Sequence, residues 1–216
     1  YYNELINSKF RSELEKVWGK QLFNLAELQL KTFSEEIIED LVKENKLVTE
    51  YDKLIASAKI DFEGEIRNLS QMTPFKQSKD RAMRKKAYEK YIEFFEENES
   101  EFDRIYDELV KVRDTMAKKL GYENYVGLGY DRLSRSDYNS EMVANYRKQV
   151  YEDLVPIVVE LKDRQRKRLG LDEMKYYDEP LEYLTGNATP KGDPDWILEN
   201  GKRMYKELSK ETHEFF

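Results

Sequence analysis

Apolar residues recur every three or four positions along most of this chain, which is the spacing of an amphipathic α-helix. Runs that alternate apolar and polar residues, as half-buried strands do, are rare. We therefore predict an all-α, multi-helix fold with at most a short strand near residues 60–70. The expected helices cover residues 35–45, 51–58, 78–98, 100–120, 140–168 and 193–208.

Capping signals set the expected helix boundaries. Ser34 and Ser78 are placed as N-caps, Ser140 is expected to start the longest helix, and Ser100 with Asp103 resembles a capping box. Gly121 and Gly170 each follow a helical stretch and tolerate the left-handed backbone that closes many helices. Asp193-Pro194 combines a cap with a first-turn proline. The helices on either side of Asn98 are expected to form an antiparallel hairpin.

Two further local predictions concern prolines. Thr73-Pro74 favours extended backbone, so residues 60–77 are interpreted as a connector. Pro156 lies inside the longest expected helix and should kink it, because proline removes a backbone donor and crowds the preceding turn. The stripe expected to be buried on that helix contains Val143, Tyr146, Val150, Leu154, Ile157, Val158 and Leu161.

The length of 216 residues allows one large domain or two small ones. The best division is near Ser78, giving an N-terminal helical segment (1–77) and a second helical segment (78–216). Charged residues make up 38% of the chain, yet aromatic residues reach 13%, which indicates a folded protein because disordered chains are poor in such rings.

The net charge of −7 argues against nucleic-acid binding, which depends on clustered lysine and arginine. The basic run at 162–168 precedes Gly170, where cations are favoured by the helix dipole, so we interpret it as a helix end. No apolar stretch is long enough to cross a membrane, and the N-terminus lacks a signal-peptide pattern. Without cysteine, disulfides and cysteine zinc sites are impossible, and we expect a cytoplasmic protein.

The single histidine limits the chemistry. Zinc hydrolases place two histidines on one helix face in His-Glu-x-x-His, and here His213-Glu214 has no second histidine. We therefore predict no catalytic and no metal-binding residue in this chain. The acidic clusters are interpreted as solvated surface, because neither has the alternating oxygen ligands of a calcium loop. These clusters are Glu35, Glu36, Glu39 and Asp40, and Glu96, Glu97, Glu99 and Glu101.

A tyrosine- and arginine-rich stretch lies between residues 130 and 138. Arginine forks bind carboxylates and tyrosine offers a ring with a hydroxyl, so Tyr130-Asp-Arg132 and Arg135-Ser-Asp-Tyr138 are able to bind a peptide. The alternative, which we favour, is a network with nearby acids that pins the loop. The sequence does not single out substrate-binding residues.

Many short blocks of the chain, in order, resemble the zinc oligopeptidases of the oligoendopeptidase F and thimet-oligopeptidase type. The resemblance covers most of the chain. Its blocks are Asp80 to Arg84, Ala87 to Phe95, Tyr106 to Arg113, Ala117 to Tyr122, Leu128 to Arg132, Arg135 to Tyr138, Val155-Pro156, Arg168 to Leu171, Tyr177-Asp178, Gly186-Asn187, Met204-Tyr205, Leu208 to Thr212 and Phe215-Phe216.

The resemblance implies a helical, ellipsoidal metallopeptidase with a deep channel for short peptides. In that family a His-Glu-x-x-His helix and a later glutamate hold zinc, and no residue of this chain matches them. The implied function is a non-catalytic portion of a zinc endopeptidase that cleaves oligopeptides, inactive by itself and without bound zinc.

The alternative from another functional class is a freestanding helical scaffold or interaction module. Such a protein should bury its ends, whereas this chain finishes on Phe215 and Phe216. Exposed apolar rings favour the first hypothesis and predict self-association through the face that the missing part would cover.

Overall fold

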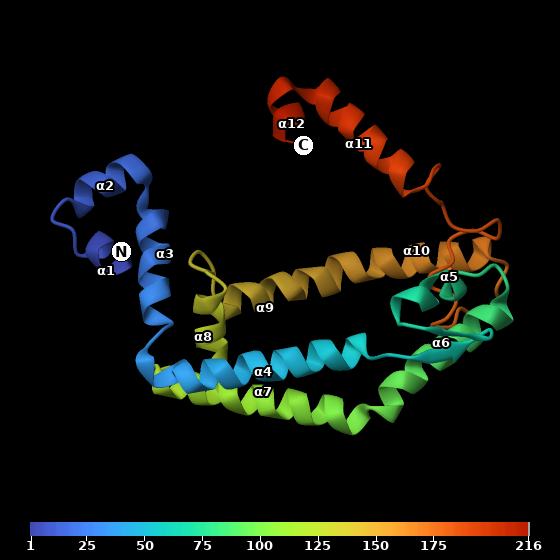
Figure 1. Ribbon diagram of the computed structural model, residues 1–216, viewed down its shortest axis with the longest axis horizontal. Coiled ribbons are helices and arrows are strands. Elements are labelled where there is room, and N and C mark those ends of the chain that lie inside the picture. Colours follow the sequence, from blue (N-terminus) through green and yellow to red (C-terminus); the bar gives the residue numbers. More distant parts are fainter. Residues whose placement is uncertain (216) are drawn as a thin grey trace.

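The computed structural model describes residues 1–215 and confirms the predicted all-α fold (Figure 1). Phe216, part of the predicted apolar end, lies outside the described residues. The α-helices are α1 (Tyr2–Ile6), α2 (Arg11–Trp18), α3 (Lys20–Lys31), α4 (Ile38–Ala56), α5 (Thr73–Lys76), α6 (Arg81–Glu97), α7 (Glu99–Lys119), α8 (Tyr125–Arg132), α9 (Ser140–Gln149), α10 (Val155–Arg168), α11 (Pro194–Leu208) and α12 (Lys210–Phe215). In residues 1–215, no helix is long and apolar enough to span a bilayer.

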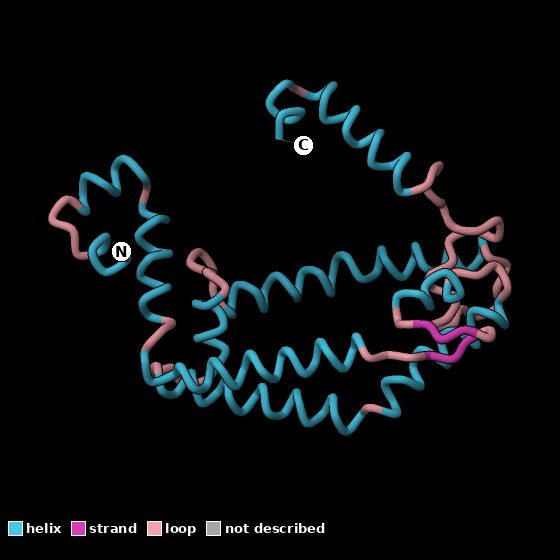
Figure 2. Tube along the Cα trace, viewed as in Figure 1, coloured by secondary structure: helices cyan, strands magenta, loops and turns pink. Residues whose placement is uncertain are grey.

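The expected short strand near 60–70 is a two-stranded antiparallel hairpin of β1 (Ile60–Phe62) and β2 (Glu65–Arg67) (Figure 2). Glu63 and Gly64 form its turn with φ of 53° and 78°, the backbone that a two-residue hairpin turn requires. The connector that follows is helical rather than extended. It contains the 3₁₀ turn η2 (Ser70–Met72) and then α5, which has a proline in its first turn.

The extended backbone predicted at Thr73 is therefore wrong. Thr73 has φ −57° and ψ −45°, which is helical. Proline in a first helical turn loses no hydrogen bond, because the amides of that turn have no partner within the helix. Because the proline costs no hydrogen bond at this position, the helix forms despite the steric preference of Thr73 for extended backbone.

The centre of the fold is the pair of long helices α4 and α7, which lie side by side (Figure 1). The two predicted segments 35–45 and 51–58 are one uninterrupted helix, α4, entered through the 3₁₀ turn η1 (Glu35–Ile37). Leu47 packs with Ile105 and Val112 between the two helices. Near the other end, the buried cluster joins η1, α7 and α8 and contains Ile37, Met116, Ala117 and Leu128.

The predicted hairpin of the helices around Asn98 is wrong. A single residue, Asn98, separates α6 from α7, and the two helices follow one another end to end while α7 lies along α4 (Figure 1). One residue is too short to reverse the chain direction. The capping box at Ser100 is also wrong, because α7 begins at Glu99 without a side-chain cap.

The other predicted N-caps are shifted or unused. Asp80, not Ser78, caps α6 by accepting from Ala82 N, and Ser78 Oγ instead accepts from Asp80 N. Helix α9 begins at Ser140, as predicted, and Asn139 is its N-cap. Ser34 stands at the N-cap position of η1, yet its buried hydroxyl makes no hydrogen bond within the described residues.

A second core lies under the β-hairpin, where α5 and α6 cover it. Its buried members are Ala58, Ile60, Phe62, Met72, Ala87 and Phe94. Ala87 and Phe94 are thus the buried positions of α6 in this core, whereas Ala82 is exposed.

The long helix predicted from residue 140 continues through a π-helical segment, η3 (Val150–Leu154), to Arg168. Its wider turn precedes Pro156, which lies in the first turn of α10, so the missing proline amide is accommodated there. Figure 1 shows this helix running apart from α4 and α7. The predicted burial of its apolar stripe is wrong: Tyr146 is 66%, Ile157 54% and Leu161 53% exposed, because no other described element covers them.

The C-terminal helices α11 and α12 extend away from the rest of the chain (Figure 1). Asp193 caps α11 by accepting from Trp196 N at 2.8 Å, with Pro194 in the first turn, as predicted. The apolar face of α11 is exposed as well, with Met204 65% and Leu208 74% exposed. Helices α9 to α12 thus carry apolar faces that the described chain leaves bare.

Candidate functional site

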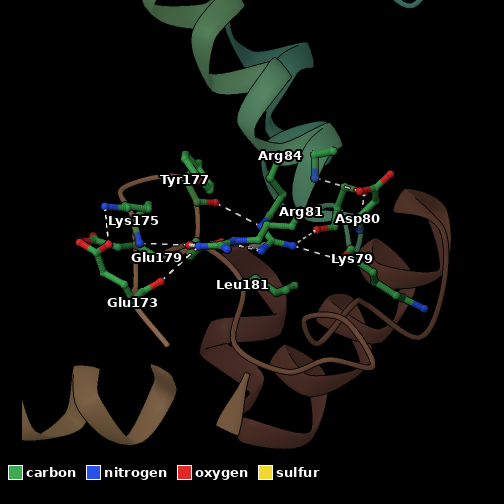
Figure 3. Close-up of polar contacts among 12 residues, drawn as sticks. Lys79, Asp80, Arg81, Arg84, Glu173, Lys175, Tyr177, Glu179 and Leu181 are labelled. Atoms are coloured by element: carbon green, nitrogen blue, oxygen red, sulfur yellow. Dashed lines mark hydrogen bonds and ion pairs between the residues drawn. The ribbon is translucent and has the colours of Figure 1, made fainter. Parts of the chain in front are cut away.

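A fully buried carboxylate, Asp178, joins the segment after α10 to the start of α6. Figure 3 shows Arg81 and Arg84 of α6 beside the segment that carries Lys175 and Tyr177. Arg81 donates to both oxygens of Asp178, at 3.0 and 2.7 Å, and Arg84 donates to Oδ1 at 2.7 Å. The amide of Lys175 adds a bond to Oδ2 at 3.0 Å. Burial opposes ionisation of Asp178, but these donors outweigh it and lower the pKa to about 2.

The buried Arg84 has all its donor nitrogens occupied. Besides Asp178, its guanidinium reaches the carbonyl oxygens of Ser78, Lys79 and Tyr177 at 2.9 to 3.2 Å (Figure 3). Gln165 of α10 holds the same segment by donating to the carbonyls of Glu179 and Leu181. Because the buried Asp178 and Arg84 bond to protein partners, this cluster fixes the chain.

A second buried carboxylate, Glu44, lies in the middle of α4. Arg132 of α8 donates to it with both terminal nitrogens, at 2.9 and 3.2 Å, and Arg113 of α7 donates at 2.7 Å. Burial opposes ionisation of Glu44, but the two guanidiniums keep its pKa below the usual value. The sequence placed Arg132 in a possible peptide-binding stretch; the structure uses it to tie three helices together.

Asp131, the neighbour of Arg132, faces α3. It accepts from Lys31 Nζ at 2.7 Å and from the hydroxyl of Tyr122 at 2.6 Å. Burial raises the pKa of Tyr122, and its bond to Asp131 raises it further. The loop-pinning network that we favoured is therefore present for Asp131 and Arg132, with partners on α3, on α4 and in the loop before α8 rather than among the acids nearby in sequence.

Arg135 differs from its neighbours. Its guanidinium carbon lies 4.8 Å from the ring centre of Tyr130 and 5.9 Å from that of Tyr138. Among the described residues, no carboxylate pairs with it. A cavity of about 620 Å³ opens beside it, between α3, α8 and the start of α9. The cavity is lined by Lys31, Tyr122, Glu123, Asn124, Val126, Gly127, Tyr130, Asp131, Arg135, Tyr138, Asn139 and Ser140.

Across residues 1–215, no three His, Asp or Glu side chains gather as a metal site requires. His213 is exposed on the short helix α12, next to exposed Glu214. The predicted acidic clusters lie mostly at the surface. Asp40 pairs with Lys119 at 2.6 Å, and Glu101 pairs with Arg104 at 2.6 Å.

Most cations of the basic run at 162–168 form ion pairs with nearby carboxylates. Arg164 pairs with Glu160, Lys167 with Asp163, and Arg168 with Glu182. The helix ends at Arg168, as predicted, so this run behaves as a charged helix C-terminus.

Two family descriptions match the chain. The Peptidase M3 N-terminal domain matches residues 1–33, and Peptidase family M3 matches residues 74–188, more than half of the chain. No curated protein matches it.

Solved structures are similar over the whole chain. One described as an oligoendopeptidase F is 59% identical with a TM-score of 0.95, and PZ peptidase A, solved with an inhibitor, is 60% identical with a TM-score of 0.94. A third structure, described as an oligoendopeptidase F from Bacillus anthracis, is 60% identical with a TM-score of 0.92. The chain spans 38%, 38% and 40% of those chains. By sequence and by fold, the chain belongs to peptidase family M3.

Proposed function

We propose that this chain is the non-catalytic portion of a zinc-dependent oligoendopeptidase that hydrolyses short peptides, and that it forms part of the wall of the substrate channel. The similarity that supports this is the 59–60% identity over the whole chain to structures described as oligoendopeptidase F or PZ peptidase A. At that identity the fold and the general reaction class are expected to be shared.

The residues present do not fit a zinc ion. Zinc in hydrolases takes three protein ligands, commonly two histidines and a carboxylate, and this chain has one exposed histidine. No catalytic step is therefore assigned to a residue of this chain. We place the metal and the water-activating glutamate in polypeptide outside these 216 residues.

The bare faces of α9 to α11 support a role as part of a larger fold. Tyr151 is 73% exposed, Val159 61% and Met204 65%, although soluble domains seldom expose so many large apolar side chains together. A freestanding scaffold would leave these faces in water at a high free-energy cost, so the enzyme-part hypothesis explains more of the structure. We place the enzyme in the cytoplasm, which agrees with the absence of cysteine.

The test compares two proteins: the 216-residue chain and the complete protein that contains it. The complete protein should cleave quenched fluorescent peptides of up to about a dozen residues, and a chelator should stop it. The 216-residue chain should cleave none. A complete protein that binds zinc but hydrolyses no peptide would overturn the proposal.

A further inference from the structure

Arg135 is a half-buried cation whose charge no carboxylate of the described residues offsets. The ring faces of Tyr130 and Tyr138 flank its guanidinium, and the two rings meet edge to face with centroids 6.3 Å apart. Cation–π contact stabilises the charge but leaves the N–H donors of the fork unsatisfied. An arginine presented in this way is suited to bind a planar carboxylate with two parallel hydrogen bonds.

The other charged groups of the cavity are already in use or lie at its edge. Lys31 and Asp131 neutralise each other at 2.7 Å, and Asp131 also accepts from Tyr122. Glu123 lies exposed at the rim. Arg135 is thus the cation that remains for an incoming anion.

A second, apolar cavity adjoins the first and shares Arg135 and Tyr138 with it. It measures about 450 Å³ and is completed by Met142, Val143 and Tyr146 of the first turns of α9. Met142 is 55% and Tyr146 66% exposed within the described chain. A carboxylate at Arg135 would therefore have an apolar pocket for the group attached next to it.

The loop that carries Arg135 is fixed rather than loose. After α8, Ser134 takes φ of 56°, its amide donates to Asp131 O at 2.9 Å, and the amide of Arg135 donates to Tyr130 O at 3.0 Å. This pair of bonds is the Schellman motif, which closes a helix. Gln21 of α3 adds a bond to Ser136 at 2.9 Å. The backbone that carries Arg135 is thus fixed before a ligand arrives, which lowers the entropy cost of binding.

We propose that Arg135 binds the C-terminal carboxylate of an oligopeptide, with the last side chain, an apolar one, in the cavity of Met142, Val143 and Tyr146. This inference rests on the proposed function and specifies the end of the substrate that this wall recognises. A free carboxylate offers two acceptor oxygens to the two N–H donors of the fork, whereas an amide offers one acceptor and points its own donors at the cation.

The experiment uses the complete protein and four fluorescein-labelled tetrapeptides, the fourth being the free acid with alanine in place of the terminal leucine. The first ends in leucine with a free carboxylate, the second is its C-terminal amide, and the third is an amide with glutamate before the leucine. Fluorescence anisotropy with chelator present measures Kd without turnover, and cleavage is measured separately in the holoenzyme. The variants are Arg135→Gln, Arg135→Lys and, as a control, Arg164→Gln, which removes an exposed arginine paired with Glu160.

We expect the free acid to bind about tenfold more tightly than the amide, because only the acid forms the charge-assisted pair of hydrogen bonds with Arg135. In Arg135→Gln this difference should fall below about twofold, in Arg135→Lys it should be partly kept, and Arg164→Gln should behave as the parent. Replacing the terminal leucine by alanine should weaken binding about fivefold, because apolar area is lost.

Three results would overturn the inference. The acid and the amide bind equally to the parent protein; the preference survives in Arg135→Gln with an unchanged melting temperature; or the glutamate-bearing amide matches the free acid, which would assign Arg135 to an acidic side chain instead. Absence of cleavage in every protein contradicts the proposed function only, since the binding measurement stands without turnover.

Discussion

Glu44 and Arg132, 88 positions apart in the chain, form a two-pronged ion pair at 2.9 and 3.2 Å that links α4 to α8. Glu44 is only 5% exposed, and Arg113 supplies the third donor from α7. A single buried carboxylate thus joins the central helix pair to the stretch that carries Arg135.

Replacing Glu44 by glutamine should lower the free energy of unfolding by about 3 kcal/mol, because two guanidiniums lose their counter-charge in a buried setting. The matched control is Glu50→Gln on the same helix, which breaks an exposed pair with Arg104 and should cost less than about 1 kcal/mol. Urea unfolding of the two variants measures the difference. Equal decreases in the free energy of unfolding for the two variants would show that the buried ion pairs of Glu44 stabilise the fold no more than an exposed pair does.

Asp178 should make the fold sensitive to acid. Its pKa is about 2 in the folded chain against an ordinary value of 3.8, so the folded state favours the ionised form. A depressed pKa contributes stability above pH 4 and loses it as the pH falls from about 4 to 2. The shift amounts to about 2 kcal/mol.

Stability measured by urea unfolding across this pH range should therefore decline in the parent chain. Asp178→Asn should be less stable at pH 7, by about 3 kcal/mol, because Arg84 keeps a buried charge. Its decline between pH 4 and 2 should be shallower than that of the parent. Parallel pH curves for the two proteins would contradict the assignment.

Two helix ends with the same Schellman geometry give opposite predictions. Gly121 after α7 has φ of 80°, and Ser134 after α8 has φ of 56°. Gly121→Ala should destabilise by about 1 kcal/mol through backbone strain alone, since a Cβ there meets no atom within 4 Å. Ser134→Gly should stabilise by a similar amount. Thermal unfolding that moves both variants in the same direction would refute this explanation.

The exposed stripe on α9 and α10 should make the 216-residue chain associate with itself. Sedimentation velocity at tens of micromolar should show species larger than a monomer. Changing Ile157 and Leu161 of α10 together to lysine should restore the monomer, whereas Gln149→Lys, at an exposed polar position at the end of α9, should not. A parent chain that stays monomeric, with little binding of a hydrophobic dye, would favour the freestanding scaffold.

The helical pattern was sufficient for fold class and for most helix positions, because those depend on local spacing and caps. Gly121, Gly170 and Asp193 act as their residue types predict. The sequence did not show which helices pack against one another or which apolar faces are covered. Nothing local indicates that α7 packs on α4 rather than on α6, and the apolar stripe at Ile157 has the same spacing whether or not a partner covers it. The division near Ser78 stays a prediction.

The candidate site was predictable only in part. The stretch from Tyr130 to Tyr138 stands out by composition, but its roles depend on partners about 90 to 115 positions away, such as Glu44 for Arg132 and Gln21 for Ser136. Neither Glu44 nor Asp178 is distinguishable from the many surface acids, because burial follows from packing. The sequence itself shows a single histidine, and this observation is the reason that we assign no zinc ligand to the chain.

The central claim is that hydrolysis belongs to polypeptide outside these 216 residues. Its most direct test measures zinc content and peptide cleavage of the purified chain beside those of the complete protein. We predict no stoichiometric zinc and no turnover for the chain, with chelator-sensitive cleavage by the complete protein. One tightly bound zinc per chain, with peptide cleavage that a chelator abolishes, would contradict the claim.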